Sequence, residues 1–270
     1  TSALPFCNPF AEPRDQEMLG CPGVPFQQLA NFVVGTEDAL DFFVSSKNPY
    51  ARWFDRSRDT RPVTPGRRTK IAVIGHSLGA AAVSQVQGTD RRVATVVALD
   101  KLQGAAPNKP SVPALAVQSE YGFTVSPWLT SAGSSLVPAP SPNGPDPRRE
   151  RRSGYDAWAK RGLDTMLVVP RASTHLEYTD IPLVLPASRY GQALTSVYVQ
   201  RWLDRYLKHR GSVKSLLATR FRYLEPSGNG RWVPVTLRRD DLLSFYYCSA
   251  YRLDSTKGLR SSGDVTGVGC

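Results

Sequence analysis

Short apolar stretches alternate with helix-like segments through the middle of the chain. Four of these stretches lack the polar alternation of a half-exposed strand, and each predicts a strand buried on both faces. They span residues 71–74, 93–99, 114–117 and 167–169. Apolar residues at helical spacing predict helices over residues 28–44, about 77–87 and 191–209. Strands and helices in this alternation indicate an α/β fold, with a mostly parallel sheet flanked by helices.

The two ends of the chain differ from this middle part. Residues 1–28 are rich in Pro and Gly and show no periodicity, so we expect irregular structure there, and residues 131–153 predict a long loop. Residues 219–237, "TRFRYLEPSGNGRWVPVTL", alternate with a period of two around Gly-Asn-Gly, which predicts a β-hairpin. We therefore expect one α/β domain over residues 1–210 and a small β-rich C-terminal extension over residues 211–270.

Composition narrows the class of protein. With 270 residues, 41% of them hydrophobic, the chain can bury a full core. No apolar run approaches the roughly 20 residues of a membrane-spanning helix, so we expect no transmembrane segment. The net charge of +11 comes from 34 Lys and Arg residues spread along the chain, dense only at residues 148–152, "RRERR", in the expected loop. Because no basic stripe is interleaved with aromatic residues, we expect no nucleic-acid partner.

The four cysteines lie in two pairs, one near each end of the chain: Cys7 and Cys21, Cys248 and Cys270. None forms a CxxC motif and the three histidines lie far from them in sequence, so we expect no metal site. The even count suits two disulfides, Cys7–Cys21 and Cys248–Cys270, although other pairings stay open. Disulfides imply an oxidising compartment. The sequence also begins at Thr1 without Met, and we expect a mature, secreted product.

The stretch "TKIAVIGHSLGAAAVSQV", residues 69–86, places a serine between two glycines where a strand becomes a helix. Strand, G-x-S-x-G and helix in this order form the nucleophile elbow of α/β-hydrolases. We expect the turn to strain Ser77 and lift its hydroxyl above the sheet, with Gly75 and Gly79 required because side chains there would collide with neighbouring elements. The backbone N–H of Leu78 then lies at a helix N-terminus, where it can donate to an oxyanion. The alternative is an ordinary glycine-rich turn.

A serine hydroxyl needs a base to become nucleophilic at neutral pH. His76 lies within the elbow and should point away from the Ser77 hydroxyl, so we expect it to pack. His209 ends the last long helix, where a cation suits the negative end of the helix dipole. His175 follows the last predicted core strand, where this fold places its base, and it is our candidate.

The base in turn needs a carboxylate to orient it. Asp100 ends the strand "VVALD", and Glu120 ends the next strand, "ALAVQSE". Both lie at the carboxyl edge of the predicted sheet, and the order serine, acid, histidine holds for either. The alternative for Asp100 is a cap or a pair with Lys101, and for Glu120 a carboxylate that anchors a loop.

Residues 74–127 resemble the platelet-activating-factor acetylhydrolase branch of the α/β-hydrolases. The matching segments are "GHSLGAAAVSQ", "VVALD" and "QSEYGF". The resemblance implies that Ser77 is the nucleophile, His175 the base and Asp100 the triad acid, because the acid of that family ends the strand after the elbow. The "SEY" segment occurs there without being the acid, which disfavours Glu120. The resemblance is loose through His175 and absent beyond residue 211.

The chain is also similar to bacterial secreted lipases and polyester hydrolases. Those carry an Asp one or two residues beyond the position of Glu120, where this chain has Tyr and Gly, and this too favours Asp100. The resemblances imply a secreted serine esterase or lipase that cleaves carboxylic esters of small molecules or lipids through an acyl-enzyme, without a metal or organic cofactor. The alternatives are an acyltransferase or amidase on the same triad, or a non-catalytic binding protein with a hydrolase fold.

One part of the hydrolase fold is not found in the sequence. In this fold several strands precede the elbow strand, and a loop after one of them supplies a second oxyanion donor. The 70 residues before Ile71 predict coil, one helix and coil, without a further buried strand or an HG-type oxyanion loop. We therefore expect this chain to be the C-terminal portion of a longer hydrolase, with the elbow strand as an exposed apolar edge. The N-terminal strands would come from a second polypeptide or lie outside this sequence.

Overall fold

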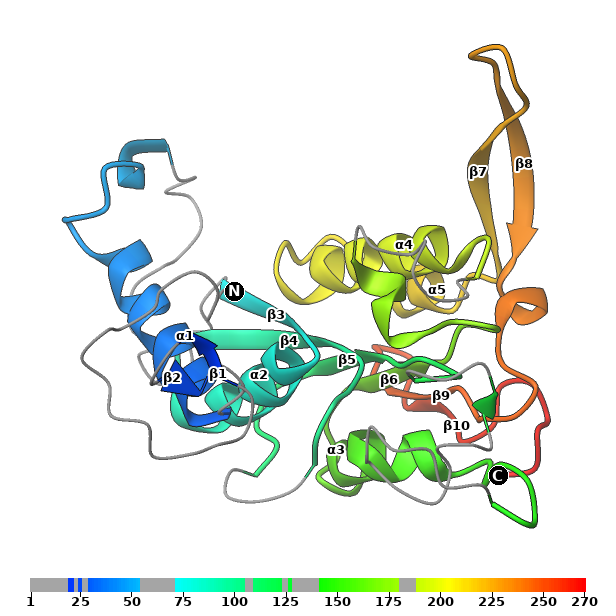
Figure 1. The fold of residues 1–270 in the computed structure, drawn as a ribbon, viewed down its shortest axis with the longest axis horizontal. Helices are drawn as coiled ribbons and strands as arrows, with labels where there is room; N and C mark the ends of the chain where they lie inside the picture. The colour runs from blue at the N-terminus through cyan, green and yellow to red at the C-terminus, as the bar shows by residue number, and fades with distance from the viewer. Residues whose placement is uncertain are drawn as a thin grey trace.

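The computed structural model describes residues 19–21, 24–25, 29–53, 71–104, 109–122, 126–127, 141–179 and 188–270. A six-stranded sheet lies at its centre, with the strand order β10-β9-β6-β5-β4-β3 (Figure 1). Its parallel strands are β3 (Ile71–His76), β4 (Val93–Leu99), β5 (Ala114–Val117) and β6 (Thr165–Val168). At the other edge, β9 (Ala250–Leu253) pairs antiparallel with β6, and β10 (Arg260–Ser262) pairs antiparallel with β9. The predicted mostly parallel sheet is confirmed.

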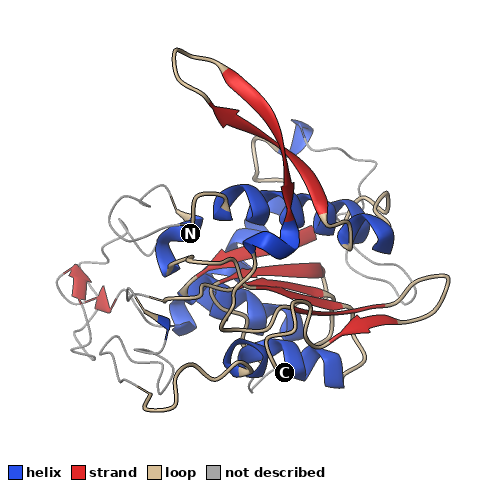
Figure 2. Cartoon of the chain, turned by 90° about the vertical axis from the view of Figure 1, so that its right-hand side faces the viewer, coloured by secondary structure: helices blue, strands red, loops and turns tan. Residues whose placement is uncertain are grey.

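Helices cover both faces of the sheet, as predicted (Figures 1 and 2). One face carries α1 (Leu29–Val44), α2 (Leu78–Thr89) and α3 (Asp156–Lys160), and the other carries α4 (Gly191–Tyr206) and α5 (Val213–Leu216). Successive residues of β4 point to opposite faces of the sheet, each of which has its own hydrophobic core. Val96 and Ala98 pack with α2 on one face, and Val97 packs with Trp202 of α4 on the other. Both faces of β4 are thus buried, which is why its sequence shows no polar alternation.

The C-terminal part contains the predicted hairpin, formed by β7 (Arg220–Pro226) and β8 (Trp232–Arg238). The hairpin projects from the body of the molecule beside α4 (Figures 1 and 2). The predicted disulfide Cys248–Cys270 is present. Cys7 lies outside the described residues, as does the side chain of Cys21, so the bridge between them stays a prediction.

The boundary expected at residue 210 does not divide the core. β9 and β10 join the central sheet, and Ala250 and Leu253 are fully buried, one in each of the two cores. The strands β9 and β10 of the C-terminal part therefore extend the central sheet. A strand that pairs with a partner about 85 residues away leaves no mark on the local sequence pattern, so the pattern could not show this pairing.

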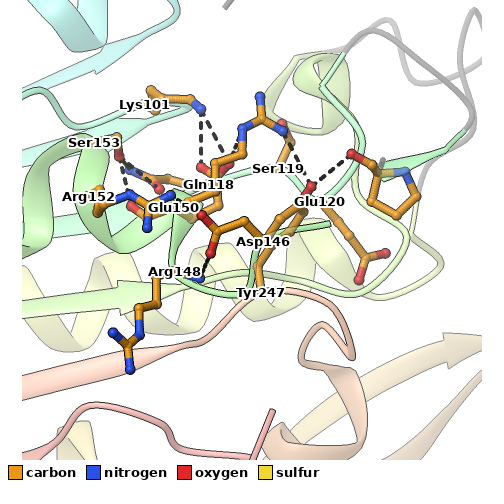
Figure 3. A network of polar contacts seen from close by, with 12 residues as sticks. Lys101, Gln118, Ser119, Glu120, Asp146, Arg148, Glu150, Arg152, Ser153 and Tyr247 are labelled. Carbon is orange, nitrogen blue, oxygen red and sulfur yellow. Dashed lines mark hydrogen bonds and ion pairs between the residues drawn. The ribbon is translucent and has the colours of Figure 1, made fainter. Parts of the chain in front are cut away.

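The segment "RRERR" is not the exposed loop that its composition suggested. Residues 149–160 are helical, and Glu150 is almost fully buried, 3.3 Å from Lys101 Nζ (Figure 3). Arg151 pairs with Asp156 at 2.8 Å, and Arg152 pairs with a further aspartate, Asp146. Two of the arginines thus pair with aspartates five and six residues away, which partly balances the charge of the segment.

The elbow strand β3 lies at the edge of the sheet. It pairs with β4, and no other strand among the described residues joins it. Ile74 on β3 is 48% exposed, as expected for an apolar edge that lacks a neighbour. The described strands nearer the N-terminus, β1 (Leu19–Cys21) and β2 (Val24–Pro25), pair with each other in the segment that we expected to be irregular. In the part of the chain described, no helix has the length and hydropathy needed to cross a bilayer.

Candidate active site

Ser77 is the single residue between β3 and α2. Its backbone has φ 58° and ψ −123°, a strained conformation for a residue with a side chain. The turn is held by a 3.0 Å bond from the N–H of Ser77 to the carbonyl oxygen of Leu99, at the end of β4. Strained backbone persists where the surroundings determine it, and it is concentrated at functional sites. The geometry is that of the predicted elbow.

The two glycines of the elbow have different roles. A Cβ on Gly75 would lie 2.1 Å from the carbonyl oxygen of Gly79, so a side chain there is excluded by the first turn of α2. A Cβ on Gly79 would meet no described atom within 4 Å, so our expectation of a collision at Gly79 is wrong. Gly75 provides the close approach, and Gly79 contributes the backbone that is approached.

The structure brings Ser77, His175 and Asp100 into one chain of hydrogen bonds. Ser77 Oγ lies 2.9 Å from His175 Nε2, and His175 Nδ1 lies 2.7 Å from Asp100 Oδ2. Asp100 directly follows β4, and His175 begins a short 3₁₀ segment, η4 (His175–Tyr178), in the loop after β6. Three elements thus deliver the three side chains to the carboxyl edge of the parallel strands.

Both carboxyl oxygens of Asp100 accept hydrogen bonds. Its side chain accepts from His175 Nδ1, from Ser119 Oγ at 2.6 Å and from the N–H of Ser119 at 3.2 Å. Burial opposes the charge, but the hydrogen bond from His175 and the nearby charge of Lys101 together hold the pKa of Asp100 below its ordinary value. A carboxylate on Nδ1 fixes the imidazole tautomer, so that Nε2 is left free to accept a proton from Ser77.

Glu120 lies in the loop-anchoring position that we had left open for it. Its Oε2 accepts from the N–H of Ala172 at 2.6 Å, and its Oε1 accepts from Ser244 Oγ. Its own N–H donates to the carbonyl oxygen of Ser173, which lies two residues before His175. Burial raises the pKa of Glu120 despite these hydrogen bonds. Both oxygens bind away from the imidazole, so Glu120 holds the histidine loop and Asp100 orients the histidine.

His76 packs as expected, but its partner is His175 itself. Its Nε2 donates to the backbone carbonyl oxygen of His175 at 2.7 Å, and the two rings lie 4.6 Å apart. Burial, together with the neighbouring His175, lowers the pKa of His76, which favours the neutral ring. The sequence predicted that this residue packs away from Ser77, but its contact with a residue 99 positions later is a tertiary one.

The third histidine, His209, is exposed and lies three residues beyond Tyr206, where α4 ends, so it does not end the helix as expected. The described residues contain no group of three or more His, Cys, Asp or Glu side chains that could hold a metal ion.

The backbone N–H of Leu78, expected as an oxyanion donor, lies at the N-terminus of α2. Leu78 is the first residue of α2, and the bonds of Ala80 and Ala81 to the carbonyl oxygen of Ser77 close the first turn. The leading N–H groups of a helix have no intrahelical acceptor, so the N–H of Leu78 is available to a ligand beside Ser77. Residues 54–70, directly before β3, lie outside the described residues. The missing second donor therefore stays a prediction.

A hollow of about 310 Å³ lies between η4 and α4, next to the histidine loop. Leu99, Tyr178 and Val199 form its apolar lining, and Tyr178 also lies against His76 with the ring centroids 5.9 Å apart. Glu177 and Thr195 add polar groups to the wall. Sequence reasoning did not find this hollow, because its lining comes from three segments that lie far apart in the chain.

Comparisons with known proteins add little to this geometry. No protein-family model matches the sequence, and a search of curated proteins found no match. Among solved structures, the chain is similar to a ferulic acid esterase from Streptomyces cinnamoneus, with 20% sequence identity and a TM-score of 0.44. The match covers 68% of this chain and 50% of the esterase chain, so this chain spans about half the length of that protein. A similarity this low assigns neither a family nor an activity.

Proposed function

We propose that this chain is a serine hydrolase of the α/β-hydrolase fold that cleaves carboxylic esters. One observation carries the proposal: hydrogen bonds of 2.7 and 2.9 Å link Asp100 through His175 to Ser77, and Ser77 lies on a strained elbow at a helix N-terminus. A nucleophile, a base within hydrogen-bond reach and a carboxylate that orients the base are the three parts that acyl transfer through a serine requires.

The first half of the reaction forms an acyl-enzyme. Ser77 Oγ attacks the ester carbonyl carbon while His175 Nε2 takes its proton, and Asp100 stabilises the imidazolium that results. The N–H of Leu78 donates to the oxyanion of the tetrahedral intermediate. When that intermediate collapses, the bond to the alkoxide breaks, and His175 Nε2 gives its proton to the leaving alcohol.

The second half repeats these steps with water. His175 Nε2 takes a proton from a water molecule whose oxygen attacks the acyl carbon, and collapse returns the proton to Ser77 Oγ as the acid leaves. The same steps with an amine or an alcohol in place of water would make the chain an acyltransferase, and attack on an amide would make it an amidase. Only product analysis separates these alternatives from hydrolysis.

We propose short to medium acyl esters as substrates. The hollow between η4 and α4, about 310 Å³ in volume, adjoins the loop that carries His175, but Ser77 is not among its lining residues, so its size sets no limit on the acyl group. Activity on peptides without activity on nitrophenyl esters would contradict this part.

Two further proposals concern the setting of the enzyme. The disulfide Cys248–Cys270 is in keeping with secretion, because such bonds persist in oxidising compartments. A second polypeptide beside β3 also stays a proposal, and its only support is the open edge of β3 among the described residues.

Labelling with a fluorophosphonate probe tests the function directly. We expect the full chain to be labelled at Ser77 and to hydrolyse a nitrophenyl ester, with both signals lost in Ser77→Ala and in His175→Gln. His209→Gln is the matched control, because it removes an exposed histidine and should leave both signals unchanged. A folded chain that is neither labelled nor active would instead support a non-catalytic binding protein.

A further inference from the structure

The β7–β8 hairpin has one face that packs on the molecule and one that does not. Residues directly opposite each other on antiparallel strands share a face, and successive residues alternate between faces. On the inner face, Phe221 is 7% exposed and packs with Leu237 into the core beside α4. Tyr223 packs edge-on against Tyr190, with ring centroids 5.3 Å apart. The base of the hairpin is therefore anchored to the body.

The outward face consists of four cross-strand pairs whose side chains are all exposed. They are Arg220 with Arg238, Arg222 with Thr236, Leu224 with Pro234, and Pro226 with Trp232. The face is divided along its length, with arginines near the base and apolar side chains in the half nearest the turn. Leu224 is 47% exposed and Trp232 is 62% exposed. An exposed apolar cluster of this kind marks an interaction surface.

The basic half of the outward face lacks balancing charge. Arg220 and Arg238 lie directly opposite each other, which is unfavourable for like charges. Arg238 has only a 3.6 Å contact with the exposed Asp241. Among the described residues, no carboxylate pairs with Arg220 or Arg222. An anionic surface would neutralise all three guanidinium groups at once.

We propose that the outward face of the β7–β8 hairpin docks on an anionic lipid surface. Trp232 and Leu224 would enter the boundary between headgroups and acyl chains, where an amphipathic indole ring is favoured. Arg220, Arg222 and Arg238 would then lie at the anionic headgroups, where basic side chains are attracted. The separation of charge from apolar surface matches a lipid interface, which is layered in the same way.

Two other occupants fit this face less well. A second copy of the chain could add a strand to the hairpin, but Pro234 removes a donor from β8 and Pro226 removes one from the end of β7. A single-stranded nucleic acid needs aromatic platforms beside basic groups along its path. Here the outward face offers one aromatic side chain, Trp232, so successive bases would lack platforms.

Contacts also connect the hairpin to the loop that carries the base. Glu225 on the inner face accepts from Tyr190 OH at 3.1 Å and pairs with Arg189. The N–H of Ser188, one residue before Arg189, donates to Glu177 at 2.8 Å, two residues beyond His175. The hairpin is thus connected through few residues to the loop that carries the base.

Vesicle flotation of the full chain tests the proposal. We use vesicles of phosphatidylcholine alone and of phosphatidylcholine with phosphatidylserine, and we expect binding to the anionic vesicles that weakens as salt is raised. Arg220→Gln with Arg222→Gln should weaken partitioning about twenty-five-fold, since each basic residue near an anionic surface is worth roughly fivefold. Trp232→Ala should weaken it by about an order of magnitude, because an inserted indole loses its apolar burial.

Matched controls distinguish binding by the outward face from general effects of charge and of exposed apolar side chains. Arg91→Gln with Arg210→Gln makes the same charge change at two exposed arginines elsewhere, and Trp53→Ala removes a tryptophan that is 73% exposed. These controls should bind vesicles as the unaltered chain does. Equal melting temperatures would show that the hairpin variants are folded.

Three results would overturn the proposal. The first is no binding to anionic vesicles, or equal binding to both vesicle types. The second is an equal loss of binding in the hairpin variants and their controls. The third is a concentration-dependent dimer, or binding to single-stranded DNA without binding to vesicles, lost in Trp232→Ala or in the arginine pair; either would assign the face to another occupant.

Discussion

Replacing Asp100 by Asn tests the assignment of the triad acid at the level of single hydrogen bonds. The carboxylate of Asp100 faces three donors, from His175 Nδ1, Ser119 Oγ and the N–H of Ser119. An asparagine at this position must turn its NH₂ group toward one of them. If it faces Nδ1, the proton of the imidazole moves to Nε2, which can then no longer take the proton of Ser77.

The expected loss of turnover can be estimated from the interaction between the two charges. Two opposite unit charges about 4 Å apart attract by about 4 kcal/mol at an effective dielectric constant of about 20. Asp100 and the His175 imidazolium, joined by a 2.7 Å hydrogen bond, make such a pair in the transition state, and Asn cannot replace the charge. Since about 1.4 kcal/mol is a factor of ten in rate, we expect turnover to fall about 10³-fold, and further where the tautomer is wrong.

Steady-state hydrolysis of a nitrophenyl ester measures this loss, and Glu120→Gln is the control. Both positions carry buried carboxylates near the histidine loop, but Glu120 binds Ala172 and Ser244 and not the imidazole. We expect Glu120→Gln to keep turnover within about tenfold of the unaltered chain, since it retains one of the two acceptor oxygens. The reverse ordering of the two variants would refute the assignment of Asp100.

Three further predictions concern Gly75, His76 and the disulfide Cys248–Cys270. Gly75→Ala should cost at least about 3 kcal/mol of folding free energy in chemical denaturation, because its Cβ would lie 2.1 Å from a backbone oxygen, and unchanged stability would contradict this contact. His76→Phe should lower kcat about tenfold with little change in KM, because the carbonyl of His175 loses its donor, whereas His76→Gln should recover most of the rate. Because the pKa of His76 is lowered on folding, the unfolded chain binds more protons, so this contribution to stability is present above about pH 6.5 and is lost as pH falls through the folded pKa. Melting curves against pH should show that loss in the unaltered chain and less of it in His76→Gln. Replacing Cys248 and Cys270 by Ser should cost about 3 kcal/mol, as expected for a bridge between residues 22 apart in sequence, and a change below about 1 kcal/mol would show that packing alone holds the C-terminus.

The sequence alone was enough to locate the elements around the site. The buried strands, the elbow at Ser77 and the loop of His175 are local features, because a strand buried on both faces and a glycine-rich turn leave their marks within a few residues. The collision predicted at Gly75 was correct and the one predicted at Gly79 was not. Only the structure shows which backbone atoms face each of the two positions.

Only the tertiary structure decided which distant residues meet. From the residues themselves Asp100 and Glu120 were equivalent, since both end strands at the same edge of the sheet; the turn of each side chain toward His175 or toward Ala172 separates them. The hydrogen bond from His76 to the carbonyl oxygen of His175, 99 residues later, also depends on the tertiary structure. The addition of β9 to β6 likewise depends on pairing between strands far apart in the chain. Hydrophobic periodicity records which face of an element is buried, and it carries no information about the partner that buries it.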